Sequence, residues 1–476
     1  MPKVLFFRTV MFFELALQLR LRLRRLSVAS PSPSPLRRHG GRRLNSELRE
    51  MAAVQPDEPS ANVRFTTRLE PSLRVTEAPI QLPVRLTRYG LSEVVNHLLG
   101  AAPPRPFDFL LQGELLRGSL GKAMARLALS GEEAVTLEYI ELLAPPQPQA
   151  GAAHDDWVAA LASQPDGGLL LTGCYDHAAY ACDAAGRRVA TLAGHDAPVK
   201  GVAWLQPAAG GGAARAATAS KDHTVRTWRV DGETSACESI GSGHDDAVEC
   251  LCANPAGSRL CSGGWDGQLL LWSGAEPAPG AAPAAPPPAA KRSRKAAAAV
   301  EAPAELSAVA RLTGHHDCVA AVCWPTATML YSAGWDGAVK AWDAGAEACT
   351  TTLPGQKAVA SLSVSLLSAL IATGHADHNL RVWDARLDKT ALAFGPAAHK
   401  GWVTGVAWSA HRAELLLSSC HDGSVKLWDT RSTVPLHELP PHADKALCVA
   451  WHGVEHVASG GADGQLKVSS LRLPSA

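Results

Sequence analysis

The sequence has no surplus of charge of either sign. Among its 476 residues, 45 Lys and Arg stand against 45 Asp and Glu, so the formal net charge is zero. A protein that coats nucleic acid by electrostatic attraction needs a basic surplus. The balance therefore argues against that class, although a local basic patch is compatible with it.

Patterns typical of metal, redox and catalytic sites are missing as well. The 11 Cys residues are scattered without a CxxC pair, which favours buried free thiols of a reducing compartment over zinc or disulfides. There is no Gly-rich phosphate loop, nucleophile elbow or HExxH motif, so we expect no enzyme and no cofactor. The apolar run Val4–Leu19 is broken by Arg8 and Glu14 and is too short to span a membrane.

What the sequence does contain is a repeat. The stretch His421–Asp429 reads HDGSVKLWD, a tight Asp-Gly turn followed by an alternating strand, and Leu415–Ser419 before it predicts a second strand. The turn aspartate recurs at intervals of 41 to 46 residues, with one interval of 70. The seven positions are Asp176, Asp222, Asp266, Asp336, Asp377, Asp422 and Asp463. A period near 40 residues indicates a repeat architecture.

Three residue types accompany the turn aspartate: a His 21 to 27 residues before it, a Ser or Thr four before it, and a Trp six after it. The complete sets are His195, Thr218, Asp222, Trp228; His244, Ser262, Asp266, Trp272; His315, Ser332, Asp336, Trp342; and His399, Ser418, Asp422, Trp428. This pattern resembles the WD40 repeat from about residue 150 to the C-terminus. Seven aspartates then imply a mainly β fold, a seven-bladed propeller over residues 144–476.

The His and Asp residues look like catalytic relays, but we interpret them as structural. A buried Asp must be paired or hydrogen-bonded, and the His, the hydroxyl and the indole N–H can supply a connected network. Three repeats are incomplete: Cys182 replaces the Trp of the first, Gln356 stands near the His position of the fifth, and Ser469 replaces the Trp of the last.

The last repeat contains only three strand-like segments before the sequence ends. We therefore expect its outer strand to come from the segment just before the first repeat, roughly Tyr139–Ala144. Such a strand would close the ring and remove an exposed sheet edge.

Residues 62–143 predict a separate α+β domain, in which two strands, a helix and two further strands follow one another. The expected elements are strands at Val63–Leu69 and Leu73–Val84, a helix at Leu91–Leu99 stopped by Gly100, and strands at Phe107–Leu111 and Ala134–Tyr139. This order is similar to the ubiquitin-like β-grasp.

The residues of this domain are more specific than its fold. Arg88–Leu99, Pro106–Phe109 and Gly113–Arg117 closely resemble the Notchless-like N-terminal domain of the WD-repeat subunits of the PeBoW complex, the pescadillo–block-of-proliferation–WD-repeat assembly. The resemblance covers about 62–476. It implies a scaffold for large (60S) subunit maturation and pre-rRNA processing in the nucleus, nucleolus and nucleoplasm.

The same resemblance implies the partners. The propeller would bind the block-of-proliferation and pescadillo proteins on pre-60S particles, and the ubiquitin-like domain would engage the MIDAS domain of the ATPase midasin. Direct contact with rRNA stays open, and no membrane partner is expected.

One carboxylate receives a role from this resemblance. In the family, a Glu in the pattern Ser-x-Glu before a strand ending in Glu-Tyr completes the shell of a Mg²⁺ ion held by midasin. Here Ser130-Gly131-Glu132 precedes Glu138-Tyr139 at matching spacing, so the role falls to Glu132. The adjacent Glu133 stays an alternative. We expect the chain alone to bind no metal.

The long interval contains an Ala/Pro-rich insertion, residues 273–305, whose composition predicts disorder. Within it lies a basic cluster of Lys291, Arg292, Arg294 and Lys295. The cluster is either a solvated charge run or a nuclear localisation signal, and in a nuclear factor we favour the signal.

The first 61 residues predict a disordered extension. The segments Leu19–Arg25 and Ser30–Pro35 are rich in Arg or Ser and lack acids, as an organelle transit peptide does. Met51 could instead be the working start, with the first 50 residues an upstream extension, and we favour that explanation.

Two other functions compete with the assembly factor. A substrate receptor of a ubiquitin ligase could combine a propeller with a ubiquitin-like fold, but no F-box or ligase-docking helix precedes the propeller. An organellar WD protein rests entirely on residues 1–50.

Overall fold

The computed structural model describes residues 59–472, except 102, 130–133, 206–212, 275–302, 356, 385–388 and 395–397. The chain forms two compact units, and the boundary between them falls between Leu143 and Ala144. The predicted N-terminal extension up to residue 58 and the basic cluster Lys291–Lys295 lie outside the described residues.

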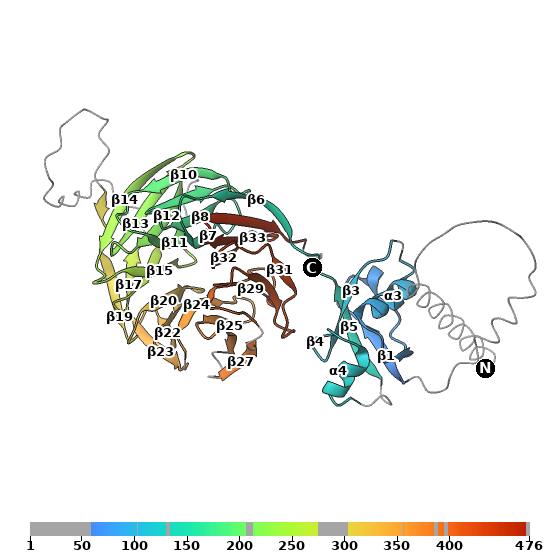
Figure 1. Ribbon diagram of the computed structural model, residues 1–476. Coiled ribbons are helices and arrows are strands. Elements are labelled where there is room, and N and C mark those ends of the chain that lie inside the picture. Colours follow the sequence, from blue (N-terminus) through green and yellow to red (C-terminus); the bar gives the residue numbers. More distant parts are fainter. Residues whose placement is uncertain are drawn as a thin grey trace, which may run out of the picture. The chain divides into compact units, whose positions relative to one another are not determined.

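The N-terminal unit is a β-grasp, in which the first and last strands run parallel at the centre of one sheet (Figure 1). The strand order is β2–β1–β5–β3–β4. The strands are β1 (Ser60–Thr66), β2 (Ile80–Pro83), β3 (Phe107–Leu111), β4 (Glu114–Leu115) and β5 (Val135–Glu141), and the helices are α3 (Arg88–Leu99) and α4 (Leu120–Arg126), with a 3-10 helix at Pro71–Leu73.

Alternation in β1 buries Val63 and Phe65 against the helical stripe that includes Leu91. Gly100 ends α3 in the left-handed conformation (φ 63°) that favours glycine. Strand β1 starts at Ser60, two residues before the predicted domain boundary, because Ser60 already pairs with Pro83.

Two details of this unit differ from the expectation. The second strand is much shorter than Leu73–Val84, because the hydroxyl of Tyr139 donates to Leu73 O (2.7 Å) and accepts from Val75 N (3.0 Å). A side chain thus satisfies backbone groups that a longer strand would pair. Helix α4 and strand β4 were not anticipated, since each is too short to show a clear period.

The second unit is a seven-bladed propeller, and its inner strands contact one another in a closed ring in which β32 meets β7 (Figure 1). Blades 1 to 3 are β7 (Val158–Ser163), β8 (Leu170–Cys174), β9 (Ala178–Cys182), β10 (Arg188–Ala193); β11 (Val199–Leu205), β12 (Ala214–Ser220), β13 (Thr224–Asp231), β14 (Thr234–Ser242); and β15 (Val248–Ala253), β16 (Arg259–Gly264), β17 (Gln268–Ser273), β19 (Ala308–Thr313).

The remaining blades repeat this order from the inner to the outer strand. Blades 4 to 7 are β20 (Val319–Cys323), β21 (Met329–Gly334), β22 (Val339–Asp343), β23 (Ala348–Leu353); β24 (Val359–Val364), β25 (Leu370–His375), β26 (Leu380–Asp384), β27 (Lys389–Phe394); β28 (Val403–Trp408), β29 (Leu415–Cys420), β30 (Val425–Asp429), β31 (His437–Leu439); and β32 (Ala446–His452), β33 (His456–Gly461), β34 (Gln465–Ser470), β6 (Gln147–Ala153).

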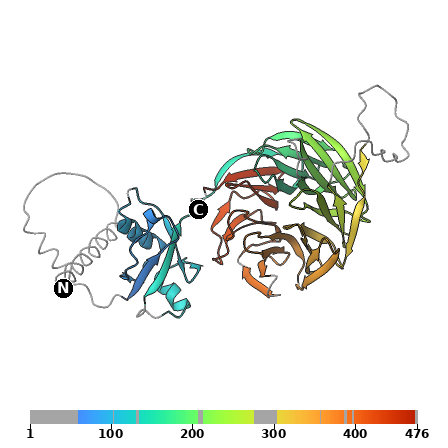
Figure 2. The ribbon, with the colours of Figure 1, turned by 180° about the vertical axis from the view of Figure 1, so that it is seen from behind.

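Blade 7 is completed by β6, which pairs antiparallel with β34 and lies beside the dark red strands in both views (Figure 1, Figure 2). The ring is therefore closed by a segment that precedes blade 1, but the expected segment Tyr139–Ala144 is wrong. Tyr139 is fully buried in the core of the ubiquitin-like unit and belongs to β5. The closing strand can begin only after that core is complete.

The predicted disordered insertion 273–305 is ordered at both ends. Ser273 belongs to β17, and Gly274 O accepts a hydrogen bond from the buried Arg215 (2.8 Å). At the other end, β18 (Ala304–Glu305) adds a parallel fifth strand to β14, and Leu306 is buried behind it. Pairing and apolar burial thus order residues that composition assigned to disorder.

Closure can be tested at Gly151, which faces β34. A Cβ at this position would collide with the backbone carbonyl oxygen of Leu466. We expect Gly151→Ala to destabilise the propeller by about 1–3 kcal/mol, the usual cost of overpacking, seen as a lower thermal unfolding midpoint. Gly118→Ala is the matched control, because a Cβ there meets open space. Equal midpoints for the two variants would show that β6 does not hold the ring.

Candidate functional site

In blades 2, 3 and 4 the structure brings each predicted set of four residues together. The His Nδ1 bonds the Asp, the His Nε2 bonds the hydroxyl, and the Trp Nε1 donates to the same hydroxyl. These three distances are 2.7, 2.7 and 2.8 Å for His195, Asp222, Thr218 and Trp228; 2.9, 2.7 and 2.8 Å for His244, Asp266, Ser262 and Trp272; and 2.8, 2.7 and 2.8 Å for His315, Asp336, Ser332 and Trp342.

Blade 6 uses one more hydroxyl. His399 Nε2 and Trp428 Nε1 both bond Ser418 Oγ (2.7 and 2.8 Å), as expected. His399 Nδ1, however, bonds Ser424 Oγ (3.2 Å), which in turn donates to Asp422 (2.5 Å). The predicted direct contact between His399 and Asp422 is replaced by a bridge. In blade 2 the hydroxyl at the same repeat position, Thr224, also bonds both His195 (3.3 Å) and Asp222 (2.6 Å), but there the direct contact is kept.

Blades 1 and 7 keep the hydroxyl bond without the Trp. His154 bonds Thr172 (3.0 Å), while Asp176 accepts from Tyr180 Oη (2.6 Å). In blade 7 the three remaining members connect as in the complete sets, at 2.9 Å for His442 to Asp463 and 2.9 Å for His442 to Ser459. Ser469 is buried where the indole is missing.

Blade 5 obtains its imidazole from an unexpected position. Gln356 lies outside the described residues, and Thr373 Oγ1 bonds His375 Nε2 (2.8 Å) and Trp383 Nε1 (2.7 Å) instead. His375 stands two residues before the turn aspartate Asp377. The equivalent residue of blade 4 is Gly334, where an added Cβ would lie 3.0 Å from His315 Nδ1. Glycine at this position therefore leaves room for the imidazole. A His at this repeat position was the signal in the sequence.

These networks are not accessible to a substrate. The hydroxyls of the four complete sets, Thr218, Ser262, Ser332 and Ser418, are all 0% exposed. A nucleophile must reach the reacting atom, so the arrangement stabilises blades and has no opening for catalysis.

Burial also sets the protonation states. It lowers the pKa of His154, His375 and His399 to about 4, helped by nearby cationic side chains. For Asp266, burial alone would raise the pKa, but the hydrogen bond and charge of His244, together with the backbone N–H groups of Gln268 and Asp245, outweigh it, and the pKa is lowered. At neutral pH, burial therefore favours neutral imidazoles at His154, His375 and His399, and hydrogen bonding favours the ionised carboxylate of Asp266.

One group of possible metal ligands occurs in the described part of the chain: His399, Cys420 and Asp422. Both ring nitrogens of His399 are hydrogen-bonded to hydroxyls, and burial raises the pKa of the Cys420 thiol to about 11. We therefore assign the group to the hydrogen-bond network of blade 6.

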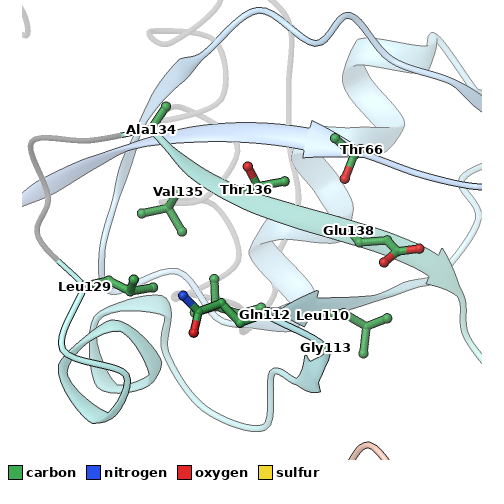
Figure 3. A pocket seen from close by; sticks show the side chains of 10 residues that line it. Thr66, Leu110, Gln112, Gly113, Leu129, Ala134, Val135, Thr136 and Glu138 are labelled. Atoms are coloured by element: carbon green, nitrogen blue, oxygen red, sulfur yellow. The ribbon is translucent and has the colours of Figure 1, made fainter.

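The ubiquitin-like unit has a hollow of about 440 Å³. Leu129 and Ala134 line one end of it and Glu138 lies toward the other (Figure 3). Glu138 pairs with Arg68 (3.1 Å). Glu132 and Glu133 lie outside the described residues, in the segment 130–133 that joins Leu129 to Ala134.

Comparison with known proteins agrees with both units. The NLE (NUC135) domain family matches residues 61–124. The WD domain, G-beta repeat, matches seven times, at residues 149–180, 186–229, 235–273, 306–343, 347–384, 394–429 and 433–468.

Full-length relatives cover both units together. A ribosome biogenesis protein WDR12 homolog of Chlamydomonas reinhardtii is 38% identical over 439 residues, 87% of this chain and 98% of the relative. The chain belongs to the WDR12 family. Further WDR12 homologs are 36% identical in Oryza sativa subsp. japonica (86% of this chain, 96% of the relative) and 32% identical in Nematostella vectensis (86% and 99%). None of the described helices is long and apolar enough to cross a membrane.

The contribution of the Asp can be measured by comparing two blades. Asp266→Ala leaves His244 Nδ1 without its buried partner, so we expect a loss of about 1–3 kcal/mol in the free energy of unfolding. Asp377→Ala should cost less, because Asp377 pairs with the partly solvated Arg381 (2.7 Å) and not with a His. Equal losses in chemical denaturation would contradict this account.

The buried imidazoles predict acid sensitivity. His154, His375 and His399 stay neutral in the folded state down to about pH 4, whereas the unfolded chain takes up protons near its ordinary pKa of 6.5. Stability should therefore fall as the pH drops from about 6.5 toward 4. We expect a lower urea midpoint at pH 5.0 than at pH 7.5 and a smaller difference in His375→Gln. Identical midpoints at the two pH values would refute the assignment.

Proposed function

We propose that the protein is a non-catalytic assembly factor required for maturation of the large (60S) ribosomal subunit and for pre-rRNA processing. The observation that carries this proposal is the similarity to ribosome biogenesis proteins over both units, up to 99% of a relative's length. The inaccessible hydroxyls of the blade networks support a binding role over a catalytic one.

In this proposal the propeller is the scaffold. It binds the block-of-proliferation and pescadillo proteins and places the ubiquitin-like unit on the pre-60S particle. A ring of seven blades, each held by a buried hydrogen-bond network, offers a rigid surface, which lowers the entropic cost of binding. The protein would act in the nucleus, with Lys291, Arg292, Arg294 and Lys295 as the import signal.

The ubiquitin-like unit would contact the MIDAS domain of midasin through Glu132, whose carboxylate would complete the coordination of the partner's Mg²⁺. Hard cations prefer carboxylate oxygens. The ends of the segment that carries Glu132 are fixed: Leu129 N bonds Met124 O (2.9 Å), and Val135 pairs with Val63 in the sheet.

Affinity purification of the tagged protein separates this proposal from a ubiquitin-ligase receptor. The assembly factor should recover pre-60S particles with the block-of-proliferation and pescadillo proteins, whereas the receptor should recover a cullin. Sequencing of the native N-terminus would test the organellar alternative.

The midasin contact predicts a strict length requirement. Glu132→Asp keeps the charge but shortens the reach by about 1.5 Å, one C–C bond. We expect it to abolish the Mg²⁺-dependent pull-down of the MIDAS domain while binding of the block-of-proliferation protein is kept. Glu133→Asp is the matched control and should bind normally. Normal binding by both Glu132→Asp and Glu132→Ala would exclude Glu132 as the ligand.

A further inference from the structure

Four indoles are exposed at one end of the propeller, although other Trp side chains are buried within its blades. Trp157 and Trp402 directly precede the inner strands β7 and β28, and Trp265 and Trp335 directly follow β16 and β21. First and second strands pair antiparallel, so these positions share one end of each blade. The four side chains are between 36% and 47% exposed, and none belongs to a blade network.

Trp265 and Trp335 form a pair across two neighbouring blades. Their ring centroids are 4.9 Å apart and the rings meet edge to face at 66°. The backbone N–H of each bonds the residue that directly precedes the inner strand of its own blade (2.9 Å in both cases). The residue before that one is Asp246 in blade 3 and Asp317 in blade 4, so an aspartate adjoins the backbone contact of each Trp.

The carboxylates are fixed and exposed. Asp246 Oδ1 and Asp317 Oδ1 each accept a hydrogen bond from the next backbone N–H (2.7 Å). Among the described residues neither forms an ion pair, because the nearby Lys200 binds Glu249 (2.7 Å) and Arg311 binds Asp245 (3.6 Å).

A buried thiol shows that these groups share one neighbourhood. Burial raises the pKa of Cys318, the carboxylates of Glu249, Asp317 and Asp246 raise it further, and the cation of Lys200 lowers it. Glu249 also accepts a hydrogen bond from Trp265 Nε1 (3.2 Å). Lys200 offsets the charge of Glu249, so the negative charge of this neighbourhood comes from Asp246 and Asp317.

The other exposed indoles have cationic neighbours. Lys445 Nζ lies 5.7 Å from the ring of Trp157. Trp402 stacks on His421, with the ring centroids 5.5 Å apart and the ring planes at 10°. The exposed Lys400 precedes Trp402 by two residues and lies at the same end of blade 6. Trp157 has charges of both signs beside it, since Asp156 Oδ1 accepts its backbone N–H (2.8 Å), whereas Trp402 has the cationic Lys400 at the same end of its blade.

We propose that Trp265 and Trp335, with Asp246 and Asp317, bind an arginine side chain on an exposed segment of a protein partner. A guanidinium group is planar, so it can stack on an indole and donate two hydrogen bonds to a carboxylate, which an ammonium group does less well. Nucleic acid is disfavoured at this pair, because its phosphates would face carboxylates. The inference goes beyond the proposed function and is independent of the midasin contact.

The full chain can be titrated calorimetrically at low salt with acetylated tetra-arginine and tetra-lysine peptides, which carry equal charge. We expect the arginine peptide to bind several-fold more tightly, with cation–π contacts and carboxylate pairing together worth about tenfold in affinity. Trp265→Leu/Trp335→Leu should remove that factor. Asp246→Asn/Asp317→Asn should remove much of it, because the negative charges are lost. The Asn oxygen can still accept the backbone N–H, so the turn should be kept.

Trp402→Leu is the matched control, because its indole is 47% exposed but has Lys400, and no aspartate, just before the inner strand of its blade. It should leave binding of the arginine peptide unchanged, and all variants should keep the wild-type thermal midpoint. Equal affinity for the two peptides, or unchanged affinity in the Trp265/Trp335 variant, would overturn the proposal. Tighter binding of a uridine decamer that depends on Trp265 and Trp335 would also overturn it. None of these results bears on the pull-down with the MIDAS domain.

Discussion

The propeller depends on one hydrogen bond that occurs in all seven blades, between a buried hydroxyl and an imidazole Nε2. Its partners are His154–Thr172, His195–Thr218, His244–Ser262, His315–Ser332, His375–Thr373, His399–Ser418 and His442–Ser459. The partners of the Asp vary between blades. In blade 1 the Tyr180 hydroxyl donates to Asp176, and in blade 6 Ser424 connects His399 to Asp422. A buried polar group must keep a partner, so the bond persists while its surroundings change.

Blade 5 shows how strong this requirement is. Gln356 stands near the usual His position of this blade, so the repeat pattern would leave the buried hydroxyl of Thr373 without an imidazole. His375 supplies the ring from the second strand instead. The space for it is the one that glycine leaves open in blades 3, 4 and 7, where a Cβ would press against the ring. The ring therefore reaches the same partner from a different position in the sequence.

The same repeat that buries these networks also leaves other positions exposed. The residue before the turn aspartate sits at the end of the second strand, where its side chain is free of the blade core. It is Trp265 in blade 3 and Trp335 in blade 4, but Lys221 in blade 2 and His421 in blade 6. The blades therefore share a scaffold and differ in the side chains that they present at this end.

The sequence by itself determined the number of blades, the β-grasp order and the members of the complete networks. These depend on Asp-Gly turns, alternation and spacing, which are local. Only the tertiary structure decided that β6 closes blade 7, that His375 replaces an absent His, and that Ser424 separates His399 from Asp422. It also decided that the two indoles before Asp266 and Asp336 meet. Each of these outcomes depends on pairing or packing between residues that no local period relates.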